Sequence, residues 1–253
     1  MIPRYEKKEI SSIFTDQHKF ETYLNIEMAI LKSLEGSKVP TGISEKIAAK
    51  AVINPERIIE IENTVKHDVI AFCTSITENL DPEVAKYFHF GVTSSDIIDS
   101  SLTLQIKEGL EIIIISYRRL LKALYNRATE MKGVVCIGRS HGMYAEPMSF
   151  GQKLLGHYNE FARRYQDLVS FYESELTIQF SGAVGNYTIV NPEAEAMAAK
   201  ILGVKVEPLS TQVIPRDRIA KLTQINSLVG CAIERLCVEI RHLPRSDVNE
   251  LHE

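Results

Sequence analysis

Long apolar stripes at helical spacing constrain the fold of this chain more than any other feature. Between Asp217 and Leu243, apolar residues recur at alternating steps of three and four, interrupted once by Asn226. This is the spacing of a coiled-coil-like seam. Similar stripes run through Ser95–Met131, which contains no proline, and from Pro147 to about Phe180. Helices of roughly 27–37 residues exceed the usual globular length, so the sequence predicts an all-α fold built on an elongated bundle. Such bundles often bury their stripes between subunits, so we expect an oligomer.

Shorter helices are expected before this bundle. Thr15 suits an N-cap, and Gly36 suits the stop of the helix that follows. Asn54-Pro55 and Asp81-Pro82 are further helix starts. Strand signals are weak and short, the best being Val134–Ile137 and Val204–Val206.

Composition excludes several classes of protein. The chain of 253 residues is 45% apolar and 25% charged, with a net charge of −4. This balance argues against a nucleic-acid binder. The four cysteines lie far apart without a CxxC pair, which fits reduced thiols in the cytoplasm better than a zinc site or disulfides. Apolar runs such as Ile112–Ile115 are too short to span a membrane, and the N-terminus shows no apolar signal region.

Two short polar segments near the N-terminus contain residues suited to binding. In "IPRY", Arg4 beside Tyr5 could grip a phosphate or carboxylate, although a terminal arginine alone is usually solvated. In "VKHDV", His67 and Asp68 lie off the apolar stripe of their helix. A carboxylate can orient an imidazole, but adjacent residues on a helix do not face each other, so surface charge is the simpler interpretation.

Two later segments carry stronger signals. In "HFGVTSSDIIDS", four small polar residues precede a long helix, which is more than N-capping needs and suits an anion site. In "GRSHGMYAEPMSFGQK", glycines flank His141, which could be a solvated residue, a metal ligand or an acid/base group. Histidine pairs at ligand spacing and clustered carboxylates are absent, so no metal is expected. We expect Pro147 to be the first residue of the next helix.

Six ordered motifs together resemble the adenylosuccinate lyase family of the fumarase/aspartase superfamily. They are "IPRY", "KHDV", "HFGVTSSD", "GRSHGMYAEPMSFG", "SGAVG" and "STQVIPRDR". The resemblance covers essentially the whole chain. It implies a β-elimination that releases fumarate from adenylosuccinate, giving AMP, and from succinylaminoimidazole carboxamide ribotide, giving AICAR. It implies no cofactor, and a cytoplasmic homotetramer whose active sites each draw on three subunits.

The resemblance also implies roles for individual residues. His141 corresponds to the general acid, with His67 in support. Arg4 and Tyr5 correspond to ligands of the nucleotide end, and His89 is expected to assist at the phosphate. The remaining substrate contacts implied are His67, Asp68, the Val69 backbone, Thr93, Ser94 and Gln212. The implied domains are a small helical domain over residues 1–93 and part of the bundle over residues 94–253.

The chain departs from the family pattern in two places. Ser140 and Tyr144 stand where the family loop often has a threonine and a second histidine. The chain ends at "RSDVNELHE", before a family signature loop of the form Ser-Ser-x-Met-Pro-x-Lys-x-Asn, which carries the serine taken to be the base. From this pattern we expect an N-terminal portion that lacks the base and a C-terminal helical domain, and that is inactive alone.

Two other functions fit parts of the pattern. One is another lyase of the superfamily, acting on argininosuccinate or a carboxymuconate, against which "IPRY", "KHDV" and "AEP" argue. The other is a helical oligomer that keeps the fold without the chemistry, which the missing signature loop favours for this chain.

Overall fold

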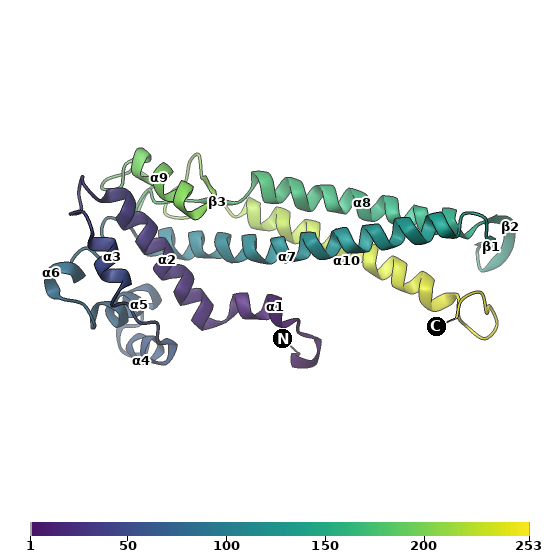
Figure 1. The fold of residues 1–253 in the computed structure, drawn as a ribbon, viewed down its shortest axis with the longest axis horizontal. Coiled ribbons are helices and arrows are strands. Elements are labelled where there is room, and N and C mark those ends of the chain that lie inside the picture. The colour runs from purple at the N-terminus through teal and green to yellow at the C-terminus, as the bar shows by residue number, and fades with distance from the viewer. Residues whose placement is uncertain (1, 253) are drawn as a thin grey trace. The chain divides into compact units, whose positions relative to one another are not determined.

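The computed structural model describes residues 2–252 and is mostly helical, with two small pairs of strands (Figure 1). The chain divides into two compact units. Unit 1 comprises the residues up to Gly109 together with Leu176–Pro215, and unit 2 comprises Leu110–Glu175 with the residues from Arg216 onward. The longest helix, α7 (Ser94–Glu130), begins in unit 1 and continues in unit 2. The domain boundary expected between residues 93 and 94 stays a prediction.

Unit 1 is built from short helices around α2, and two of its helix starts confirm the expected caps. The Thr15 hydroxyl accepts the backbone N–H of His18, and the Asn54 side chain accepts that of Arg57. Besides the start of α7, its elements are η1 (Pro3–Tyr5), α1 (Lys8–Ser11), η2 (Ser12–Phe14), α2 (Asp16–Leu34), α3 (Ile43–Ala48), α4 (Pro55–Val65), α5 (Asp68–Thr77), α6 (Pro82–Ala85), β3 (Thr177–Ile178), α9 (Pro192–Leu202) and β4 (Lys205–Val206).

An aromatic cluster holds the core of unit 1 together. The Phe72 ring, which is fully buried, stacks on Phe20 at 6.0 Å and meets the edge of Tyr23 at 5.4 Å. Phe88 packs against the same ring at 5.8 Å. These contacts join α2 and α5 to the segment before Gly91, so they fix the loop that leads into α7.

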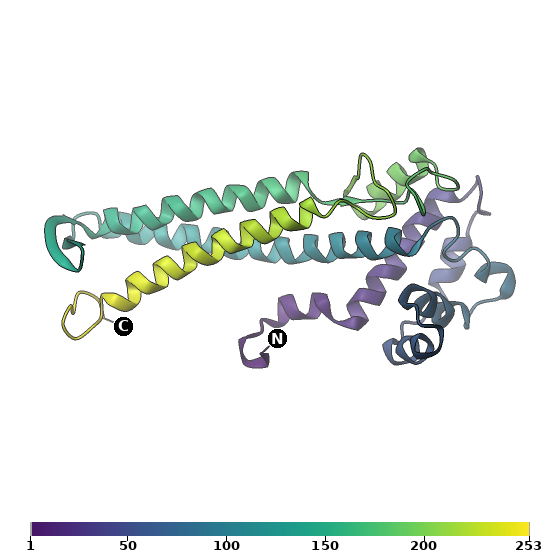
Figure 2. The same ribbon diagram turned by 180° about the vertical axis from the view of Figure 1, so that it is seen from behind.

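Unit 2 consists of long helices and a β-hairpin. Its elements are the remainder of α7, β1 (Val135–Ser140), β2 (Met143–Ser149), α8 (Phe150–Ser174) and α10 (Asp217–His242). Helices α8 and α10 run side by side (Figure 1, Figure 2). Tyr117 of α7 packs against Phe161 of α8 at 5.7 Å, so the apolar stripes meet as the sequence predicts. Helix α10 confirms the expected range, 217–243, to within one residue.

The predicted start of the second long helix is wrong. Pro147 lies in β2, opposite Ile137, and α8 begins at Phe150. A hairpin of two strands tolerates proline because each strand has an unpaired edge. The true N-cap is Ser149, whose hydroxyl accepts the N–H of Gln152. The helix also ends at Ser174, because Leu176 starts the extended segment containing β3, which pairs with β4.

Both expected strands are present. Val134–Ile137 overlaps β1, which extends to Ser140, and Val204–Val206 overlaps β4. Within residues 2–252, no helix is long and apolar enough to cross a lipid bilayer.

Candidate active site

The structure brings His67 and Ser94 together, although 27 residues separate them in the sequence. His67 is the N-cap of α5, and its Nδ1 lies 3.4 Å from the Ile70 N–H that it accepts. Its Nε2 lies 3.3 Å from Ser94 Oγ in the first turn of α7. In a neutral ring that accepts at Nδ1, the proton is on Nε2, which then donates to Ser94. The starts of two helices therefore meet at this contact.

Asp68 holds the first turn of α5. Its Oδ1 accepts the Val69 N–H at 2.8 Å and lies 3.4 Å from His67 Nδ1. The two side chains approach each other because His67 has extended backbone rather than helical backbone. The Val69 N–H, which the resemblance assigns to substrate, donates to Asp68 in this structure.

Asp96 fixes the start of α7 from inside the protein. It is fully buried, and its Oδ2 accepts the Thr93 N–H at 2.9 Å, as in half of a capping box. Burial and the charge of Glu195 raise the pKa of this carboxyl to about 7, against the opposing effect of the Thr93 and Gly182 N–H groups and His89. The group therefore titrates near neutrality.

The loops "SGAVG" and "STQ" lie against each other. Ser181 Oγ is 2.8 Å from Ser210 Oγ. The Gln179 amide donates to the backbone oxygen of Gln212, whose side chain is exposed. Gly185, at φ +79°, approaches so closely that a Cβ there would lie 2.2 Å from the Ser210 carbonyl oxygen. Sequence reasoning identified both loops, and the structure shows that they form one packed surface.

Buried carboxylates tie these loops to the helices. Glu195 of α9 accepts the Phe180 N–H at 2.7 Å and the Tyr187 hydroxyl at 2.8 Å. Asp99 of α7 accepts the Ile214 N–H at 2.8 Å. Sequence reasoning missed both acids, since their partners are distant in the sequence. The sequence signal that could have identified them is an acidic residue at a helix position where the apolar pattern predicts burial.

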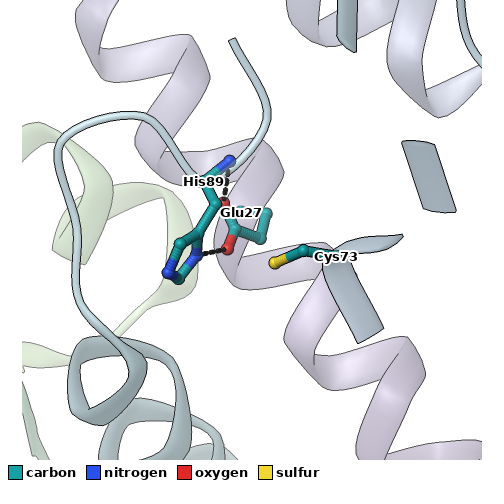
Figure 3. Close-up of side chains that lie close together, drawn as sticks. All are labelled: Glu27, Cys73 and His89. Carbon is teal, nitrogen blue, oxygen red and sulfur yellow. Dashed lines mark hydrogen bonds and ion pairs between the residues drawn. The ribbon is translucent and has the colours of Figure 1, made fainter. Parts of the chain in front are cut away.

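His89 lies beside the buried Glu27 and the partly buried Cys73 (Figure 3). Its Nδ1 donates to Glu27 Oε1 at 2.6 Å. The ligand atoms of the three residues lie within 4.8 Å of one another and are types that zinc accepts. However, tetrahedral zinc ligands lie about 3.3 Å or more apart, given bonds of about 2.0–2.1 Å. The 2.6 Å distance from His89 Nδ1 to Glu27 Oε1 is that of a direct hydrogen bond. Burial raises the pKa of the Cys73 thiol, which disfavours the thiolate that a metal needs.

Arg4 and Tyr5 form an exposed pair at η1. The Arg4 guanidinium donates to the Tyr5 hydroxyl at 2.8 Å and lies 4.7 Å from the ring centre. Both side chains are accessible to solvent, so the guanidinium has N–H groups available for an anion.

His141 lies at the tip of the β1–β2 hairpin in unit 2. Ser140 pairs with Met143, so His141 and Gly142 are the whole turn, with φ values of +54° and +75°. Positive φ at both positions is typical of a type I′ turn. The imidazole is exposed. A pocket of about 620 Å³ lies beside the turn and is lined by residues including Gly142, Tyr144 and Lys153.

The ten predicted site residues are therefore distributed unequally. His141 belongs to unit 2, and the other nine belong to unit 1. Within unit 1, a direct contact joins His67 to Ser94, and Asp68, Val69 and Thr93 belong to the same two helix starts.

A family model described as Lyase matches residues 4–253, so the chain belongs to this lyase family. Curated relatives named adenylosuccinate lyase match all of the chain. The one from Synechocystis sp. is 41% identical over 254 residues, and the one from Thermotoga maritima is 39% identical over 254 residues. The chain spans 59% of the length of each.

Solved structures confirm the fold. A fumarate lyase from Mesorhizobium sp. BNC1 has a TM-score of 0.90 at 23% identity, covering 96% of this chain and 59% of its own. A 3-carboxy-cis,cis-muconate lactonizing enzyme from Pseudomonas putida has a TM-score of 0.87 at 22% identity, covering 96% of this chain and 58% of its own. At these identities the likeness concerns the fold alone.

Gly185→Ala should destabilise unit 1 by about 2–3 kcal/mol, because the new Cβ combines positive φ with a clash against the Ser210 carbonyl. Gly182→Ala is the matched control, since Gly182 has φ +82° and open space around its Cβ position. Calorimetry should show a clearly lower unfolding temperature for Gly185→Ala than for Gly182→Ala. Equal unfolding temperatures would show that the two loops do not pack this closely.

Asp96→Asn should flatten the pH dependence of stability. Because the folded-state pKa is raised to about 7 from the ordinary 3.8, the folded protein holds this proton more tightly than the unfolded chain. The contribution of Asp96 is therefore full below the lower pKa and declines as the pH rises toward the higher one. Unfolding temperatures measured from about pH 5 to about pH 8 should fall more steeply for the wild type than for the variant. Asp81→Asn, at an exposed residue paired with Lys50, is the control, and parallel curves for the wild type and Asp96→Asn would refute the buried titration.

Proposed function

We propose that the protein is an adenylosuccinate lyase. It would release fumarate from adenylosuccinate, giving AMP, and from succinylaminoimidazole carboxamide ribotide, giving AICAR. The observation that carries this proposal is the match to adenylosuccinate lyases at 37–41% identity across the whole chain. The six motifs quoted above contain the residues that we assign to the reaction, including the imidazoles and the helix starts of the site.

The proposed reaction needs an acid at the departing nitrogen. A base removes a proton from the carbon beside a carboxylate, and the C–N bond breaks with its electron pair moving to nitrogen. We assign His141 as the group that protonates this nitrogen. An imidazole titrates near neutrality, which suits a proton donor at physiological pH. Its place on a two-residue turn leaves His141 exposed to solvent.

The helix starts of unit 1 suit the anionic parts of the substrate. The first turns of α5 and α7 bring the positive ends of two helix dipoles together, and Ser94 adds a hydroxyl beside His67. We assign Thr93 and Ser94 to the succinyl carboxylates, and His67 with Asp68 and Val69 to orienting the substrate. Arg4, Tyr5 and His89 are assigned to the nucleotide end, and Gln212 to a further contact.

The proposed elimination consists of two proton transfers and the breaking of the C–N bond, with no change of oxidation state that needs a redox partner, so the proposal includes no metal or organic cofactor. We further propose a cytoplasmic homotetramer with active sites shared between subunits. The long helices support this assembly, because apolar side chains such as Ile115, Ile233 and Ile240 are about half exposed in the single chain.

Turnover of a panel of candidate substrates tests the proposal. The full-length gene product should turn over adenylosuccinate and succinylaminoimidazole carboxamide ribotide, with AMP and AICAR identified by chromatography. Argininosuccinate and 3-carboxymuconate should be inert. Turnover of either of these without turnover of adenylosuccinate would assign the protein to another lyase of the superfamily, and no turnover at all would favour a non-catalytic oligomer.

His141→Ala in the full-length protein should lower kcat by about 10²–10⁴-fold, since a positioned general acid contributes on this scale. Adenylosuccinate should still bind, because the residues assigned to substrate binding are unchanged. His18→Ala is the matched control, since His18 pairs with Glu108 away from the motifs and should keep near-normal turnover. A His141→Ala protein with near-normal kcat would remove His141 from the acid role.

A further inference from the structure

We propose that Glu27 is a positioning residue that keeps His89 doubly protonated, so that Nε2 of the ring is a cationic donor to an anionic group of the substrate. Neither the sequence motifs nor the named relatives assign a role to Glu27. The identity of the anion rests on the proposed function, whereas the state of the His89 ring does not.

The geometry shows one carboxylate holding one histidine at two points. Glu27 Oε1 accepts from His89 Nδ1 at 2.6 Å, and Oε2 accepts from the His89 backbone N–H at 3.1 Å. With each oxygen bound to a different group of the same residue, the carboxylate fixes both the ring and the main chain. The backbone of His89 has φ +60°, a conformation that histidine adopts at some cost. The bond to the N–H helps to hold it there.

In the Glu27–His89 pair, the carboxylate is buried and the imidazole is partly exposed. The Glu27 side chain is 1% exposed, whereas the His89 side chain is 25% exposed. Figure 3 shows that Nε2 is turned away from Glu27, on the far side of the ring. A buried carboxylate next to a partly exposed imidazole leaves one ring nitrogen committed to the protein and the other available for a ligand.

The charges around the ring favour the imidazolium form. Burial lowers the pKa of His89, but the hydrogen bond and charge of Glu27 from α2 and the charge of Asp96 from α7 outweigh it, so the pKa is raised. Cys73 faces the pair from α5 and stays a neutral thiol, because burial and Glu27 raise its pKa. A doubly protonated ring is a donor only, and a charge-assisted bond to phosphate or carboxylate oxygen is roughly twice as strong as a neutral one.

Deuterium exchange at the histidine C2 carbon measures the state of the ring without any need for activity. Followed by peptide mass spectrometry on the folded full-length protein, it yields the pKa of each histidine separately. For wild type we expect the His89 midpoint above 6.5, its ordinary value. In Glu27→Gln, which keeps the shape and removes the charge, the midpoint should fall by about one unit or more.

Kinetics with adenylosuccinate then test the consequence for the substrate. Near pH 7.5, Glu27→Gln should raise KM by about tenfold with a smaller change in kcat, because it weakens binding rather than proton transfer. The rise of KM with pH should begin at lower pH in the variant than in wild type. His89→Gln should show the raised KM at every pH.

Glu35→Gln is the matched control. Glu35 caps the same helix, its side chain is 6% exposed, and it accepts from the N–H and hydroxyl of Ser44. The same substitution there should cost stability and leave both the His89 midpoint and KM unchanged. If Glu35→Gln moved them equally, Glu27 would have only a structural role.

The outcomes separate this proposal from the proposed function. An unchanged His89 midpoint in Glu27→Gln overturns the positioning role, and so does a wild-type midpoint below 6.5, which can be measured even if the variant does not fold. A lowered midpoint in a protein that does not turn over adenylosuccinate would support the role of Glu27 and refute the substrate.

Discussion

Buried carboxylates that accept backbone N–H groups hold the loops of unit 1 in place. Glu27, Asp96, Asp99 and Glu195 are each at most 5% exposed, and each binds the N–H of a residue in or next to a motif loop. An isolated charge in the core is costly, and these hydrogen bonds offset that cost only while the loops are in place. Displacing these loops should therefore also lower the stability of the core. Thr93, for example, is held in place by the buried Asp96, which accepts its N–H.

Much of the fold could be predicted because the relevant interactions are local. N-caps at Thr15 and Asn54 act within three residues, and the stripe of α10 repeats over its whole length. The start of α8 was mispredicted because proline suits both a first helical turn and an unpaired strand edge. The choice between them depends on pairing with Ile137, ten residues earlier in the chain.

The candidate site could be predicted only in part. Motif residues were found because several small polar residues precede a helix, which is visible in a short window. The partners that position them were not found, since Glu27 and His89 are 62 residues apart, and Asp99 and Ile214 are 115 apart. Nothing local distinguishes Glu27 from a surface acid of an amphipathic helix. For His67, a local assumption gave the wrong expectation. Adjacent residues on a helix do not face each other, but His67 has extended backbone, so its side chain can approach that of Asp68.

The position of His141 is set by the strand pairing of the β1–β2 hairpin, which leaves it as one of two turn residues. A two-residue turn leaves the position of the imidazole to main-chain pairing, with Ser140 opposite Met143 and Arg139 opposite Tyr144. Side chains around the turn can therefore change at little cost, as Ser140 and Tyr144 do relative to the family pattern. Length is more constrained, because one residue inserted into a regular ladder reverses the faces of the side chains that follow it, and the register shift between Ile137 and Arg139 already accommodates one extra residue in β2. The segment around His141 should therefore tolerate substitutions more readily than insertions and deletions.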